Sequence, residues 1–223
     1  MTGARGTADR FRDLVHRRLL PGLADLGFGH RLPGSLVATE ATGVCWLLDL
    51  HVAPWTTPQK VTFTVAWGAH VPGIAEAVGD PEPEFPTIDG CVVSGRLGQR
   101  DPVVDPRWFE LRSFPRPVAA VSDQALSNHI LTAVRTEVQP ILRGLSTPVE
   151  VQRHLHKHLV TGRGAPSADE LRAVRRIAAL SLLLGDRTNA ARWLDHLEER
   201  SASAMAPDLV AERLAPLRER LAS

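Results

Sequence analysis

Two stretches of alternating residues do most to restrict the fold of this chain. In residues 44–52 every even position is apolar, and in residues 61–67 the odd positions are bulky while the even ones are small or polar. Alternation with a period of two is typical of β-strands that bury one face. No helical pattern separates the two stretches, so they predict an antiparallel sheet rather than a parallel one.

Weaker patterns extend this sheet. Residues 34–39 and 91–93 are further strand segments, which brings the expected sheet to about four strands. Ten of the 17 prolines fall between Pro54 and Pro117, and they should keep the strands short and the loops long.

Helical patterns lie on both sides of the strand region. Residues 8–26 carry apolar side chains at three- and four-residue spacing, with Pro21 expected to bend the helix and Gly27 to end it. A second helical pattern begins with Ser122 or Asp123 as its cap. It is bent or ended at Pro140, and a further helix is expected from Thr147 to about Val160.

The C-terminal segment predicts a helical hairpin followed by one more helix. After a linker at 161–167, Ser167 and Glu170 form a capping-box pattern, and Gly185 turns the chain into a helix over 188–200. The hairpin resembles one tetratricopeptide-type unit, and a last helix covers about 208–221. One hairpin cannot bury its own apolar face, so it should pack on the main domain, the last helix or a partner. The expected fold is therefore an α+β domain at 1–160 with a helical extension at 161–223.

Composition excludes several classes of partner. The 26 basic and 25 acidic residues give a net charge of +1, which provides no field for attracting nucleic acid or anionic lipid. No apolar run approaches the ~18 residues of a membrane span, and the N-terminus lacks a secretory signal. Cys45 and Cys91 form no metal or redox motif and are expected to be buried free thiols. The sequence thus predicts a soluble, cytoplasmic protein without membrane or nucleic-acid partners.

A series of short motifs carries a family resemblance. In order they are Leu20-Pro21-Gly22-Leu23, Leu26-Gly27-Phe28, Leu48-Asp49-Leu50-His51, Phe63-Thr64-Val65-Ala66-Trp67, Phe85-Pro86, Cys91, Arg96-Leu97-Gly98 and Trp108-Phe109. From residue 8 to about 159 this order resembles the bacterial domain-of-unknown-function 4304 family. The resemblance implies an α+β fold of unknown biochemical function and no catalytic residues. The chain departs from the family at His51, where a polar amide is common, and at Phe109, where a second tryptophan is common.

Four residues are candidates for ligand binding. Asp49 and His51 should share one strand face about 7 Å apart, as half of an acid–base site or as a polar face satisfied by hydrogen bonds. Arg96 suits a carboxylate or phosphate, or a structural salt bridge with Asp89, Asp101 or Asp105. Trp108 suits a ligand groove near Trp55 and Trp67, or the core.

No motif of a known metal or catalytic centre is complete. His154 and His158 are four residues apart and would share a helix face, but no carboxylate or cysteine close in sequence completes a zinc site. Glycine-rich phosphate loops, nucleophile elbows and zinc-protease motifs are absent from the sequence. We therefore expect no catalytic residue, metal or cofactor.

Three functional hypotheses remain open. The first is a non-enzymatic binding or protein-interaction module that docks a protein partner through its C-terminal helices. The second is a small-ligand-binding protein or an enzyme that uses the sheet face of Asp49 and His51 together with Arg96. The third is an immunity or defence-associated protein that masks a toxin. The second depends on whether these three side chains meet in one pocket.

Overall fold

The chain forms two compact units. The computed structural model describes residues 6–32, 35–39, 43–99, 105–112, 116–159, 167–201 and 207–223. Unit 1 comprises Met1–Thr39, Cys45–Gly68 and Thr87–Arg143, and unit 2 comprises Glu40–Val44, Ala69–Pro86 and Gly144–Ser223. These limits differ from the predicted division at residue 160. The physical reason is that residues 69–86 and the helix beginning at Pro148 pack with the C-terminal helices.

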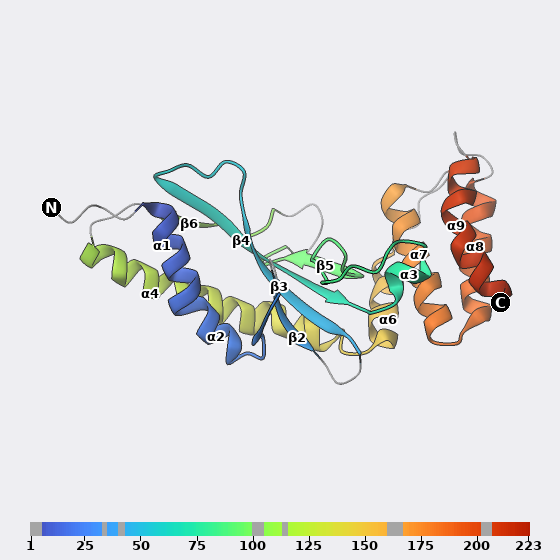
Figure 1. The fold of residues 1–223 in the computed structure, drawn as a ribbon, viewed down its shortest axis with the longest axis horizontal. Coiled ribbons are helices and arrows are strands. Elements are labelled where there is room, and N and C mark those ends of the chain that lie inside the picture. Colours follow the sequence, from blue (N-terminus) through green and yellow to red (C-terminus); the bar gives the residue numbers. More distant parts are fainter. Residues whose placement is uncertain are drawn as a thin grey trace. The chain divides into compact units, whose positions relative to one another are not determined.

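An antiparallel sheet organises unit 1 (Figure 1). In the described part of the chain its order is β1-β2-β3-β4-β5, and β6 also pairs with β4. The pairings β1–β2, β2–β3 and β4–β6 are antiparallel, with Phe63 opposite Phe109. The six strands are β1 His30–Leu32, β2 Ser35–Thr39, β3 Cys45–Val52, β4 Lys60–His70, β5 Val93–Arg96 and β6 Phe109–Arg112.

The predicted antiparallel sheet flanked by helices is confirmed. All four expected strand segments are present, although β5 begins at Val93 rather than at Cys91. The two further strands, β1 and β6, are three and four residues long. Segments this short carry too little alternation to be recognised in the sequence.

The core of unit 1 lies on the face of β4 that carries its odd-numbered residues. As predicted, Val61, Phe63, Val65 and Trp67 are buried. The ring of Phe63 lies 4.9 Å from that of Phe11 in α1 and 5.7 Å from that of Phe109 in β6, measured between centroids.

The opposite face of β4 is buried as well, so the expectation of one exposed face was wrong. Thr62, Thr64 and Ala66 are all buried. The hydroxyl of Thr64 donates a hydrogen bond of 2.8 Å to the carbonyl of Arg107, which brings a loop over this face.

The N-terminal helix follows the predicted pattern and is interrupted before its proline. It consists of α1 Thr7–Leu14, a π-helical turn at Val15–Leu19, and α2 Leu20–Ala24. The ring of Pro21 would clash with the backbone of the preceding turn in a regular α-helix. The π-helical turn at Val15–Leu19 is wider and relieves this clash. Gly27 ends the helix at φ +96°, with the hydrogen bonds of a Schellman motif from Gly27 to Ala24 and from Phe28 to Leu23.

The long helix after β6 begins earlier than predicted. It runs as α4 Arg116–Ala133, a π-helical turn at Val134–Val138 before Pro140, and α5 Gln139–Arg143. The two expected caps, Ser122 and Asp123, both lie inside α4, and the Asp123 carboxylate is bound by Arg10 at 2.6 Å. A long-range ion pair has therefore taken the side chain that the local pattern assigned to a helix end.

Unit 2 is mainly helical where it is described. Its helices are α3 Ile74–Ala77, α6 Pro148–His158, α7 Ala168–Leu183, α8 Arg187–Ser201 and α9 Pro207–Ala222. Thr147 caps α6 with both bonds of a capping box, as predicted. Ser167 caps α7 by accepting from the Glu170 amide at 3.1 Å. The Glu170 carboxylate binds Arg200 instead of completing the predicted box.

The predicted hairpin of α7 and α8 is present and receives cover from earlier parts of the chain. Gly185 turns the chain at φ +76°, and α3 packs against α7 and α9. Arg175 of α7 donates to the carbonyl of Val78 at 2.7 Å, and Arg220 of α9 binds Glu76 at 2.7 Å. Much of the apolar face of the tail, including Val174, Ile177 and Leu194, is thus buried within unit 2, and the hairpin does not stand alone.

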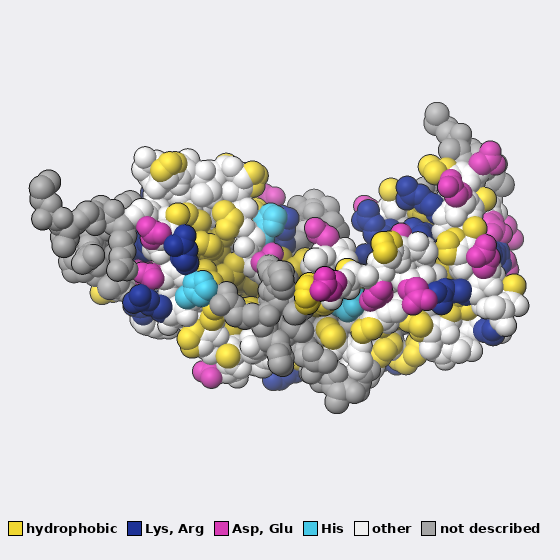
Figure 2. All heavy atoms as spheres, viewed as in Figure 1, with side chains coloured by type: hydrophobic (Ala, Val, Ile, Leu, Met, Phe, Trp, Pro, Cys, Tyr) yellow, Lys and Arg dark blue, Asp and Glu magenta, His cyan; other side chains and the backbone are white. Residues whose placement is uncertain are grey.

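Two observations bear on partner classes. No helix in the described residues combines the length and the apolar character needed to cross a membrane. On the face of the molecule shown in Figure 2, acidic and basic side chains are interspersed over the C-terminal helices.

Candidate functional site

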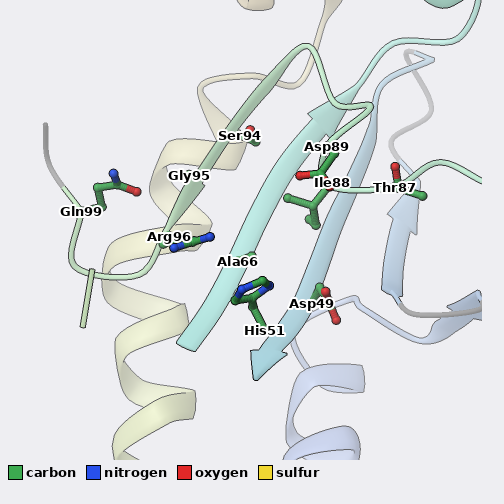
Figure 3. Close-up of a pocket in the computed structure, with 10 residues that line it drawn as sticks. All are labelled: Asp49, His51, Ala66, Thr87, Ile88, Asp89, Ser94, Gly95, Arg96 and Gln99. Atoms are coloured by element: carbon green, nitrogen blue, oxygen red, sulfur yellow. The ribbon is translucent and has the colours of Figure 1, made fainter. Parts of the chain in front are cut away.

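Three of the four predicted site residues meet in one cavity of unit 1. Asp49, His51 and Arg96 line a space of about 360 Å³ (Figure 3). This volume lies in the range of pockets that hold small ligands. The remaining lining residues are Ala66, Thr87, Ile88, Asp89, Ser94, Gly95 and Gln99.

Neighbouring segments place the polar groups at the cavity. Asp49 and His51 are two residues apart on β3, and strand alternation puts both on the same sheet face, as predicted. Asp89 comes from the turn that precedes β5. This turn is held by hydrogen bonds from the Gly90 amide to the Thr87 carbonyl at 3.1 Å and to the Thr87 hydroxyl at 3.2 Å.

Opposite charges line opposite sides of the cavity. In Figure 3, Arg96 and Gln99 lie on one side, and Asp49 and Asp89 lie on the other. The sheet order places β4 between β3 and β5. With a spacing of about 4.8 Å between neighbouring strands, the backbones that carry Asp49 and Arg96 are about 10 Å apart.

Burial acts on the Asp49 carboxylate. Partial burial raises the pKa of Asp49 above its ordinary value, and the negative charge of Asp89 raises it further. The hydrogen bond from the Leu50 amide and the charge of His51 lower the pKa of Asp49. A raised pKa means that folding favours the protonated form of Asp49. This contribution to the free energy of unfolding is fully present at a pH below the ordinary pKa of aspartate. It is lost as the pH rises through the pKa of the folded protein. The ionised form of Asp49 is therefore disfavoured by its place in the folded chain, and carboxylates perturbed in this way are common at functional sites.

Trp108 supports Arg96 rather than lining the cavity. The Arg96 guanidinium lies 5.9 Å from the centroid of the Trp108 ring, within cation–π range. Trp108 in turn packs edge-on against Trp55, with 5.0 Å between the ring centroids. Trp108 is not among the residues that line this cavity, and its indole restricts the position of the Arg96 cation.

Arg96 forms no ion pair with a carboxylate in the described part of the chain. The expected alternatives Asp89 and Asp105 are not bound to it, and Asp101 lies outside the described residues. Although Arg96 and Asp89 line the same cavity, they are not within salt-bridge distance. The positive charge of Arg96 therefore remains directed at the cavity without a described carboxylate partner.

A second cavity adjoins Arg96 on the other face of the sheet. It measures about 210 Å³ and shares Arg96 and Gln99 with the first. Trp67 lines the second cavity and Ala66 the first, so the two cavities lie on opposite faces of β4. Its remaining lining residues are Leu97, Gly98, Thr136, Glu137, Val138 and Ile141.

Asp89 and Gln99 are among the lining residues that sequence reasoning did not predict. Asp89 was considered only as a salt-bridge partner of Arg96, and Gln99 was not considered. The Asp-Gly pair at 89–90 is a turn signal, but a turn signal does not show where the aspartate side chain points. Asp89 and Gln99 reach the cavity only because the segment at 87–99 packs against β4.

His154 and His158 of unit 2 lie side by side. The rings of His154 and His158 lie 4.3 Å apart between centroids, on one face of α6 as expected. Burial lowers the pKa of His154, and the charges of His158 and Lys157 lower it further. Among the described residues, no group of three or more His, Cys, Asp or Glu side chains is placed to hold a metal ion.

We expect purified protein to retain no stoichiometric zinc after dialysis against a weak chelator. Two imidazoles provide half of the ligands that a structural zinc site requires. Metal content measured by mass spectrometry, with the His154→Ala variant as the control, checks this. One equivalent of zinc that disappears in His154→Ala would contradict the prediction and locate the site.

The chain has no match among the known proteins compared with it: no family model matches it, and neither a curated protein nor a solved structure gives a significant match. The resemblance to the domain-of-unknown-function 4304 family therefore stays a prediction. The function has to be argued from the cavity.

Proposed function

We propose that this protein is a non-enzymatic binding module whose unit 1 holds a small polar ligand with an anionic group. The observation that carries the proposal is Arg96, a cation held against Trp108 that faces a cavity without pairing with a described carboxylate. A guanidinium presents a planar set of donors that fits a carboxylate or a phosphate. The ligand's anion would supply the missing partner.

The rest of the lining supports a polar ligand. Seven of the ten lining residues carry hydrogen-bonding side chains: Asp49, His51, Thr87, Asp89, Ser94, Arg96 and Gln99. Such a surface would leave polar groups unsatisfied against an apolar ligand, at a cost in affinity. Binding rather than catalysis is proposed because no nucleophile hydrogen-bonded to a general base is found among these residues.

A protein-docking role for unit 2 is the second candidate. Three leucines are exposed there: Leu183 and Leu184 at the end of α7 and Leu209 on α9. Leu183 and Leu184 are adjacent at the end of α7, whereas Leu209 lies at the other end of these helices, because the start of α8 contacts the end of α9. The leucine pair at the end of α7 therefore carries this candidate. We propose this role as an addition to ligand binding in the cytoplasm, since it uses different residues from the cavity.

We expect small carboxylates or phosphate to raise the melting temperature of the wild-type protein and to release or absorb heat on titration. Replacing Arg96 with Gln should weaken the binding by about tenfold or more, because a charged hydrogen-bond donor is lost. Isothermal titration calorimetry with acetate, succinate and phosphate measures this. Arg135→Gln is the matched control, because Arg135 is exposed and lines neither cavity.

A pair of cavity-filling variants assigns the binding to one cavity. Ser94→Trp should abolish binding because Ser94 lines the larger cavity, whereas Ile141→Trp should leave it unchanged because Ile141 lines only the smaller one. The proposal fails if none of the three anions binds, or if Arg96→Gln binds them as tightly as the wild type.

A further inference from the structure

We infer that the ligand is a zwitterion, with its anionic group on Arg96 and a cationic amine between Asp49 and Asp89. This inference rests on the proposed function and names the class of compound that the cavity accepts. It goes beyond anion binding because it assigns a role to the two aspartates on the other side of the cavity (Figure 3).

Asp49 has only His51 beside it as a group that can carry a positive charge, and no arginine or lysine of the described residues is bound to either aspartate. Neither Asp49 nor Asp89 forms a salt bridge with a basic residue in the described part of the chain, although Arg96 lines the same cavity. Asp89 is close enough to Asp49 to disfavour its ionisation. Two carboxylates on the same side of one cavity attract a cation from solution, and a ligand amine supplies both charge and hydrogen-bond donors.

The geometry favours an organic cation over a metal ion. Asp49, Asp89 and His51 line one cavity, but no three described His, Cys, Asp or Glu side chains converge as metal ligands. A divalent cation needs several ligands at about 2.0–2.6 Å. An ammonium group tolerates wider spacing, because each of its hydrogen bonds extends to about 3 Å.

The sheet also limits the length of the ligand. Asp49 on β3 and Arg96 on β5 are separated by β4, so their backbones are about 10 Å apart. One molecule can join the two sides only if its charges are separated by a suitable number of bonds. The affinity should therefore be highest at one ligand length and lower for shorter and longer ligands. Non-specific attraction between the ligand and the charges of the cavity would not produce such an optimum.

Calorimetry with two matched series of compounds tests the inference. The first comprises unbranched amino carboxylates from glycine to 6-aminohexanoate, and the second comprises the monocarboxylates of the same lengths, from acetate to hexanoate. We expect the best amino carboxylate to bind about tenfold or more tightly than its matched monocarboxylate, because it gains charged hydrogen bonds. We expect shorter and longer amino carboxylates to bind less well.

The aspartate variants should change the two series in opposite directions. Asp49→Asn and Asp89→Asn should weaken the best amino carboxylate by about tenfold each. The same variants should leave monocarboxylate binding unchanged or stronger, because a repelling charge is removed. Asp25→Asn is the control, because Asp25 is exposed and lies outside the cavity. Asp49→Asn should melt no lower than the wild type at neutral pH, since the ionised form of Asp49 is disfavoured by its place in the folded chain.

The outcomes separate this inference from the proposed function. If monocarboxylates bind through Arg96 and the matched amine brings no gain, the proposed function stands and the zwitterion inference is overturned. An advantage of the amino carboxylate that survives in Asp49→Asn, in Asp89→Asn and in the double variant also overturns it. If neither series binds, both proposals fail.

Discussion

Replacing Phe63 with Ala is expected to lower the free energy of unfolding by about 3–5 kcal/mol. Phe63 is fully buried on β4, and its ring contacts those of Phe11 and Phe109. The substitution removes apolar surface from the core and leaves a cavity that α1 and the sheet can close only in part. Since domains are stable by only about 5–15 kcal/mol, the loss should be obvious in chemical denaturation.

The same substitution at an exposed phenylalanine is the control. Phe85 is 39% exposed, so Phe85→Ala should change the free energy of unfolding by much less than Phe63→Ala, because most of the surface it removes is already in contact with water. A denaturation midpoint that is unchanged in Phe63→Ala would show that the odd-numbered face of β4 does not form the core.

Replacing Glu170 with Gln is expected to cost about 3–5 kcal/mol. Glu170 and Arg200 form an ion pair between α7 and α8, and their side chains are only 4% and 14% exposed. Glutamine keeps the size of the side chain and removes its charge. The Arg200 cation then loses the Glu170 carboxylate in a poorly hydrated place, and the loss of this charge pair is the source of the cost.

Two further variants separate this effect from general damage to the helices. Glu198→Gln removes a carboxylate that binds Arg218 on the surface of unit 2, and exposed pairs of this kind contribute about 0–1 kcal/mol. A double variant, Glu170→Leu with Arg200→Met, should recover most of the lost stability because no unpaired charge remains. If Glu170→Gln unfolds at the wild-type denaturant concentration, the pair does not hold α7 and α8 together.

Local patterns in the sequence predicted the sheet and several helix ends. The alternation over 44–52 and 61–67 corresponds to β3 and β4, because side-chain direction alternates along any strand. Thr147 caps α6, and Gly27 ends α2 through a left-handed conformation. These features depend on interactions within a few residues, so they can be read without knowledge of the fold.

The same local reasoning failed where a distant residue competed for a side chain. Asp123 was expected to cap a helix, but it binds Arg10 from the other end of unit 1. Glu170 was expected to complete a capping box, but it binds Arg200 thirty positions away. An arginine brought close by packing offers a carboxylate a stronger partner than a backbone amide at a helix end.

The cavity shows the same division between sequence and tertiary structure. The sequence alone placed Asp49 and His51 on one strand face and singled out Arg96 as a cation for an anionic ligand. Only the tertiary structure put β4 between β3 and β5, brought Asp89 and Gln99 to the cavity, and held Arg96 against Trp108. Strand alternation is a property of neighbouring residues and is visible in any sequence. Strand order and the pairing of charges depend on contacts between distant residues, which form only when the whole chain has packed.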